Sequence, residues 1–176
     1  MNVFDNIQGV KHVVAESSLL HATEVGHIYS LKCHEDLDNG SIVCVGGFAG
    51  EFADGQVFNS KAYVEGEAPY FVLTPPLGYN ADRKYYQDEC YFYNAKGEIA
   101  RAYQLHLHDI FTVSEDAFAV APVVGQFVDA TYALSDEAPE AGFVGEVISV
   151  VNYTNSKSYR IAVRSLGMKF EERRIK

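Results

Sequence analysis

The chain has 176 residues, which suits one domain and is too short for two well-filled hydrophobic cores. Apolar residues make up 48% and charged residues 22%, which predicts a chain that folds by itself and excludes a wholly disordered one. The net charge of −10 argues against a nucleic-acid partner, and no apolar run approaches the length that crosses a bilayer, so no membrane partner is expected.

Residues 1–27 mix short apolar pairs, such as Val13-Val14 and Leu19-Leu20, with polar residues. They sustain neither the spacing of an amphipathic helix nor the alternation of a strand. We therefore expect residues 1–27 to form an extended N-terminal arm, followed by a β domain over residues 28–167. The start of the chain also lacks the basic and apolar regions of a secretory signal, which predicts a protein made inside a cell.

Three turn signals each separate two strand-like runs and predict a β-hairpin. The strongest is the pair Asn39-Gly40, because both residues tolerate the positive φ that a type I′ turn demands. In the second turn, Gly97 is the expected left-handed residue. The predicted hairpins join the runs 28–31 and 41–45, the runs 91–93 and 99–107, and the runs 143–151 and 159–163.

Strand-forming residues are abundant along the chain, which holds 12 Tyr and 11 Phe but no Trp. Short runs bounded by Gly, Pro, Asn or Asp have the spacing of a sandwich or barrel. The fold class predicted is mostly β, a compact antiparallel β-sandwich or barrel with an N-terminal arm and a basic C-terminal tail. Strands are expected over residues 56–63, 70–74, 90–93, 100–107, 110–113, 125–132, 143–153 and 158–164, and short helical turns over 79–89 and 114–118.

Charge is unevenly distributed along the chain. Residues 1–156 carry 7 basic and 22 acidic side chains, a net charge of −15, whereas residues 157–176 carry 7 basic and 2 acidic ones, a net charge of +5. A basic segment on an acidic body either folds back on its own domain or reaches an acidic patch on a neighbour. Residues 168–176 have too few apolar side chains to pack as a core element, so partner contact is expected for this tail. Its candidate contact residues are Lys169, Arg173 and Arg174.

Three cysteines at irregular spacings form neither a disulfide framework nor a paired metal knuckle, so reduced thiols are expected. His106 and His108 flank Leu107, and strand alternation would place both imidazoles on one face, where such a pair can bind a transition metal. A half-exposed strand with leucine inward and histidine outward has the same pattern. Because no second spaced pair completes a tetrahedral set, no metal and no other cofactor are expected.

A catalytic set can be assembled on paper from Cys90 as nucleophile, His106 as base and Asp109 as its orienting group. Only the residue types support it. The apolar neighbours of Cys44 and the aromatic neighbours of Cys90 indicate buried, unreactive thiols. We therefore do not expect an enzyme. An enzyme that uses these three residues stays an alternative, as does a cytosolic β-barrel that binds a small ligand.

Aromatic residues are densest between residues 85 and 93. Tyrosine is favoured where one end of the side chain is apolar and the other is wet, as on a protein contact surface. In the competing interpretation, alternate rings pack inside while their neighbours cover an exposed sheet face. The residues of this region expected to bind a partner are Tyr85, Tyr86, Tyr91 and Tyr93.

Residues 38–43 have the sequence DNGSIV, residues 91–103 have YFYNAKGEIARAY, and residues 109–114 have DIFTVS. With the intervening segments, over residues 28–165, they resemble small proteins encoded beside the major capsid protein in tailed bacteriophages, which are head decoration or accessory structural proteins. The resemblance implies a non-enzymatic structural virion protein, assembled in the host cytoplasm and located on the virion. It also implies the major capsid protein or other virion proteins as partners, a homo-oligomeric or lattice-bound state, and no catalytic residues.

Overall fold

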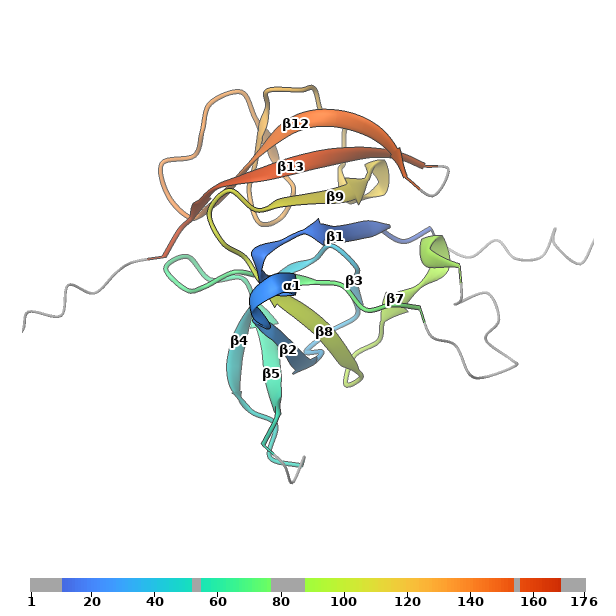
Figure 1. Cartoon of the computed structure of the whole chain (residues 1–176), viewed down its shortest axis with the longest axis vertical. Coiled ribbons are helices and arrows are strands. Elements are labelled where there is room, and N and C mark those ends of the chain that lie inside the picture. The colour runs from blue at the N-terminus through green and yellow to red at the C-terminus, as the bar shows by residue number, and fades with distance from the viewer. Residues whose placement is uncertain (1–10, 52–54, 77–87, 154–155, 169–176) are drawn as a thin grey trace, which may run out of the picture.

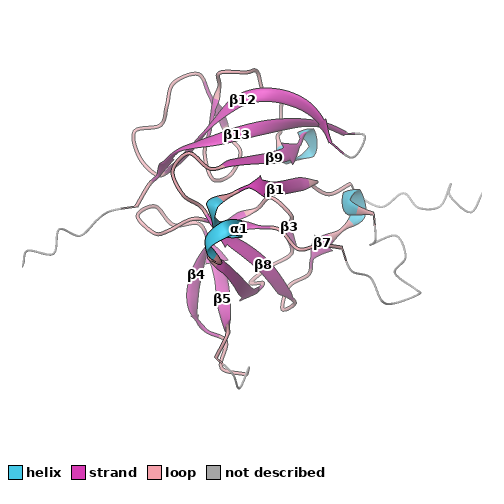
Figure 2. Ribbon diagram, viewed as in Figure 1, coloured by secondary structure: helices cyan, strands magenta, loops and turns pink. Residues whose placement is uncertain are grey.

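The computed structural model describes residues 11–51, 55–76, 88–153 and 156–168, and these residues are built mostly of strands (Figure 2). A six-stranded sheet lies over a small five-stranded barrel (Figure 1). The strands are β1 (Ala15–Leu19), β2 (Ile28–Lys32), β3 (Leu37–Asp38), β4 (Ile42–Phe48), β5 (Val57–Ala62), β6 (Tyr70–Val72), β7 (Tyr93–Asn94), β8 (Ile99–Gln104), β9 (Ile110–Ser114), β10 (Phe127–Val128), β11 (Leu134–Ser135), β12 (Phe143–Tyr153) and β13 (Ser156–Leu166). The helical elements are α1 (His21–Val25), η3 (Glu89–Tyr91) and η4 (Glu115–Ala117).

All neighbouring strands of the six-stranded sheet are antiparallel, in the order β1-β9-β13-β12-β10-β11. Its longest unit is the β12–β13 hairpin, in which Phe143 lies opposite Leu166 and Tyr153 lies opposite Ser156. The third predicted hairpin is therefore confirmed. The β-branched residues of both strands fit a pleated, half-buried surface, and the two strands are adjacent in the chain, so local sequence is enough to predict their pairing.

The barrel closes in the order β2-β5-β4-β6-β8. Its strands β2 and β5 run parallel, with Ser30 opposite Val57, and its other neighbouring strands are antiparallel. Even an eight-stranded barrel has an interior that side chains just fill, and five strands enclose less space. We therefore expect the side chains of the barrel's own strands to fill its interior. The buried side chains of its strands include Leu31, Val43, Val72, Ala100 and Ala102.

The mostly β fold class is confirmed, but two of the three predicted hairpins are wrong. Both turns exist: Gly40 has φ 94° and Gly97 has φ 84°, the left-handed conformation that glycine favours. The flanking strands nevertheless pair elsewhere, β2 with β5 and β8, β4 with β5 and β6, and β7 with β3. Turn residues set the local bend of the chain, whereas strand partners depend on which faces can be buried together.

Of residues 90–93, expected to be a strand, Cys90 and Tyr91 instead lie in the 3-10 helix η3, and Tyr93 begins the short strand β7. Asp88 caps this helix, because its carboxylate accepts a hydrogen bond from the Cys90 N–H at 3.3 Å. The helical turn expected over residues 114–118 is confirmed as η4. Most of the other expected turn, residues 79–89, lies outside the described residues.

Residues 11–27 are not an extended arm, which corrects the predicted domain boundary. Strand β1 pairs with β9, and its register shifts between Glu16 and Leu19 before the chain enters α1. Because a short strand is followed at once by a short helix, neither the alternation of apolar residues in the strand nor their helical spacing extends far enough to be recognised in the sequence. The rest of the predicted arm and tail, residues 1–10 and 169–176, lies outside the described residues. Buried residues of the corrected segment are Val13, Val14, Ala15, Leu20 and Ala22.

One apolar core joins the barrel to the six-stranded sheet. Phe71 on β6 and Phe111 on β9 are both almost fully buried, and their ring centroids lie 4.6 Å apart. Tyr159 on β13 belongs to the same cluster, and its hydroxyl donates to the Glu115 carboxylate at 3.0 Å. Since this cluster draws side chains from both sheets, the barrel and the sheet share one hydrophobic core.

Candidate functional site

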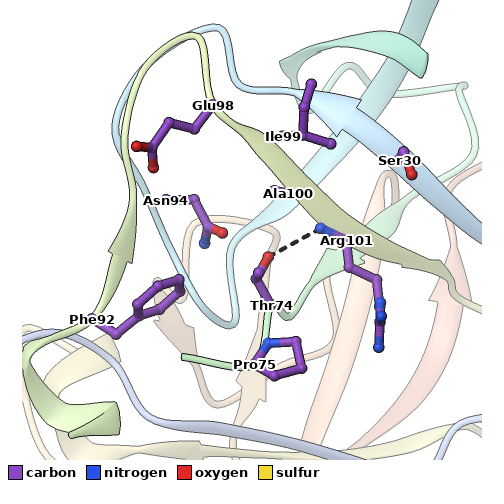
Figure 3. Close-up of a pocket in the computed structure, with 9 residues that line it drawn as sticks. All are labelled: Ser30, Thr74, Pro75, Phe92, Asn94, Glu98, Ile99, Ala100 and Arg101. Atoms are coloured by element: carbon purple, nitrogen blue, oxygen red, sulfur yellow. Dashed lines mark hydrogen bonds between the residues drawn. The ribbon is translucent and has the colours of Figure 1, made fainter. Parts of the chain in front are cut away.

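An open groove of about 470 Å³ runs along the outside of the barrel beside β8 (Figure 3). Figure 3 shows Phe92 and Pro75 on one side of it and Ile99 on the other. The exposed side chains of Glu98 and Arg101 give the same groove one acidic and one basic group. The groove therefore combines apolar contact area with charges of both signs, the mixture found in protein contact surfaces.

Two buried amide side chains hold one wall of this groove in place. Asn39 accepts a hydrogen bond from the Thr74 N–H at 2.9 Å and donates to the Thr74 carbonyl at 3.0 Å. Asn94 in turn donates to the Asn39 side-chain oxygen at 3.2 Å. The Thr74 hydroxyl accepts from the Arg101 N–H at 3.0 Å, the dashed line in Figure 3. These bonds fix Thr74, and with it Pro75, against β8.

A second groove of about 370 Å³ borders the same Thr74-Pro75 segment, which lines both grooves. Glu16 and Glu89 contribute carboxyl groups to it. Burial raises the pKa of Glu89 above its ordinary value, and the Asp88 charge beside it acts in the same direction. Two carboxyl groups make this second groove a poor place for an anion.

Of the aromatic residues predicted to bind a partner, Tyr91 and Tyr93 lie within the described residues. Tyr93 has a structural contact, because its ring stacks on His12 with the centroids 4.8 Å apart. His12 is held in turn by Asp38, whose carboxylate accepts from His12 Nδ1 at 2.7 Å. Phe92, between the two tyrosines, is the aromatic residue that lines the groove, and no pattern in the sequence distinguished it from them. The remaining predicted contact residues, Tyr85, Tyr86, Lys169, Arg173 and Arg174, lie outside the described residues.

A histidine cluster surrounds the fully buried carboxylate of Asp109. His21 donates to this carboxylate from Nδ1 at 2.6 Å and from its backbone N–H at 3.0 Å, and the His106 backbone N–H donates at 2.8 Å. The His106 ring stacks on that of His27 with centroids 5.6 Å apart. The expectation that His106 and His108 project from one face of a strand is wrong, because β8 ends at residue 104 and His108 has φ 72°. Residues 106–109 instead form a turn, in which the Asp109 carboxylate accepts from the His106 backbone N–H.

The set proposed for an enzyme, Cys90 with His106 and Asp109, is not brought together. The Cys90 carbonyl accepts from the His12 N–H at 2.8 Å, whereas Asp109 bonds to His21, and the strand β1 between them spans roughly 15 Å. Burial and the Asp88 carboxylate raise the Cys90 pKa to about 11, which opposes thiolate formation.

Cys44 is buried, as predicted, and Cys33 is buried as well, whereas Cys90, also expected to be buried, is only half-buried. Among residues 11–51, 55–76, 88–153 and 156–168, no three His, Cys, Asp or Glu side chains are arranged to hold a metal ion.

Stability is expected to depend on pH through His21. Its hydrogen bond and its attraction to the Asp109 carboxylate raise the His21 pKa above the ordinary value of 6.5. A raised pKa in the folded state stabilises the protein fully below the ordinary value, and this contribution disappears as pH rises through the folded-state pKa. Chemical denaturation between pH 6 and pH 8 should therefore show wild type losing stability relative to His21→Gln. His27→Gln keeps the His21–Asp109 contact, so its stability should change with pH as that of wild type does. If the unfolding free energies of wild type and His21→Gln changed equally with pH, the prediction would be contradicted.

No protein-family model matches this chain, and no curated protein or solved structure is significantly similar to it. None of the helices in the part that the structure describes is long and apolar enough to cross a membrane. The described residues thus form a β protein in which a small barrel and a six-stranded sheet share one core, and the Thr74-Pro75 segment borders two of its surface grooves.

Proposed function

We propose that this chain is a non-enzymatic structural virion protein, a capsid decoration or head accessory protein that binds the capsid lattice. The observation that carries the proposal is the groove along β8, with Phe92 and Pro75 beside the exposed Arg101. Aromatic residues and arginine are enriched among the residues that dominate protein–protein binding energies. The resemblance of residues 38–43, 91–103 and 109–114 to phage head proteins supplies the partner, the major capsid protein or another virion protein.

The groove suits a segment of a partner protein better than a small molecule. Small-molecule sites enclose most of the ligand surface, whereas this groove is open along β8. A partner segment would place apolar side chains between Phe92 and Ile99 and set a carboxylate against Arg101. The rigid wall made by Asn39 and Thr74 lowers the entropic cost of binding, because the groove is ordered before the partner arrives.

The test is co-sedimentation of the purified protein with capsids assembled from the major capsid protein of the same genome. We expect wild type to bind, and Arg101→Glu and Phe92→Ala each to weaken binding by about tenfold or more. Arg160→Glu, a matched charge reversal at an exposed position of β13 outside the groove, should bind like wild type. Failure of wild type to co-sediment, or equal losses for both arginine variants, would refute the proposal.

A further inference from the structure

Strand β12 leaves part of one edge uncovered within the described residues. On that side, Phe127 and Val128 of β10 pair only with Glu146 and Gly145. The next residue, Val147, is also covered, since its carbonyl accepts from the Gly125 N–H at 2.8 Å and its N–H donates to the Gln126 carbonyl at 2.9 Å. In the part of the chain that the structure describes, residues 149–152 pair with β13 alone, and Ile148 lies in the register shift between Val147 and Ser149.

The uncovered stretch lacks two of the devices that protect a sheet edge, charged side chains and proline, and a register shift lies at its start. Residues 148–152 have the sequence ISVVN, with no charged residue and no proline. A register shift between Val147 and Ser149 marks the start of the stretch, and the pairing with β13 is regular beyond it. Val150, at its centre, is 46% exposed although it is apolar. An edge of this kind is a template for pairing with another strand.

An exposed apolar loop leads into this edge. Val120, Val123 and Val124 are 70%, 64% and 53% exposed, and the last of them directly precedes Gly125, whose N–H donates to the Val147 carbonyl. The loop passes beside β12 in Figure 1. Exposed apolar residues next to an unpaired edge add area that a partner would remove from water.

We propose that residues 148–152 pair antiparallel with the same residues of a second copy, about a twofold axis at Val150. This axis must be perpendicular to the plane of the sheet. Side chains of residues that lie opposite each other therefore project from the same face of the combined sheet. Val150 then faces Val150 of the second copy, Ser149 faces Val151, and Ile148 faces Asn152.

The uncharged sequence of residues 148–152 suits pairing with a second copy of the chain. Near a twofold axis a charged residue would lie close to the same residue of the other copy and be repelled, and this stretch has no charged residue. Each copy carries a net charge of −10, so the two bodies repel, and salt should strengthen the pairing by screening that repulsion. The inference is independent of capsid binding, which uses the groove along β8.

Sedimentation velocity on the purified full chain tests the inference. The 19.5 kDa chain should form a dimer of twice that mass, more fully at higher salt. Val150→Lys and Val150→Glu should each weaken the dimer by about tenfold or more, because like charges then face each other. An equimolar mixture of the two variants should restore dimers, because opposite charges then meet across the axis.

Val64→Lys is the matched control, since Val64 is also 46% exposed but lies outside this sheet. It should dimerise like wild type. A wild type that stays monomeric at every salt concentration would overturn the inference. So would a dimer insensitive to Val150→Lys, a loss of equal size in Val64→Lys, or a mixture of the two Val150 variants that stays monomeric. Circular dichroism of each variant separates lost pairing from lost folding.

Discussion

Replacing Phe71 with alanine is expected to lower the free energy of unfolding by about 3–5 kcal/mol. Phe71 is 0% exposed, and its ring packs against Phe111 across the junction of the barrel and the six-stranded sheet. Alanine leaves a cavity where both sheets meet, so the loss combines the transfer free energy of the ring with lost packing on both sides. Urea denaturation followed by circular dichroism and by tyrosine fluorescence measures it.

Phe48→Ala is the control, because Phe48 is 62% exposed and its ring stacks on that of Phe58 in the barrel. Its effect should stay near ~1 kcal/mol or below. In a double-mutant cycle, Phe71→Ala and Phe111→Ala should be less than additive, since the rings share one contact. Two separate unfolding transitions would show that the barrel and the sheet do not fold as one unit, and additive losses would show that the two rings do not stabilise each other.

Replacing Asp109 with alanine is expected to cost about 3 kcal/mol of folding free energy. The buried carboxylate accepts hydrogen bonds from the backbone N–H groups of His21 and His106, and from the His21 ring. Removing it leaves these donors without their acceptor at the point where α1 meets the turn after β8. Asp109→Asn keeps the shape and one acceptor oxygen, so it should lose less.

Asp36→Ala is the matched control, because the exposed Asp36 carboxylate accepts from the Lys96 N–H at 2.8 Å. We expect it to cost about 1 kcal/mol or less. Asp109→Asn should also reduce the pH dependence assigned to His21, because it weakens the hydrogen bond and removes the charge that most raise the His21 pKa, and leaves the smaller effect of Glu24. Equal losses in thermal denaturation for Asp109→Ala and Asp36→Ala would contradict the assigned role.

The candidate site was only partly predictable from the sequence. The dense aromatic run drew attention to residues 91–93, but the ring that lines the groove is Phe92, and Tyr93 instead stacks on His12. The sequence also grouped His106 with Asp109, yet it missed His21, which lies 88 residues before Asp109 and bonds to it. No local pattern links residues so far apart, because their contact exists only once β1 has paired with β9.

The features determined by the sequence itself are those with local causes. Strand-forming composition determined the mostly β class, glycine conformational freedom determined the bends at Gly40 and Gly97, and two adjacent β-branched runs determined the β12–β13 hairpin. Tertiary structure alone decided that β2 pairs with β5 and β8, and that Val13 and Leu20 belong to the core. The physical reason is that strand partners and burial follow from which apolar faces can cover one another, a property of the whole chain and of no single segment.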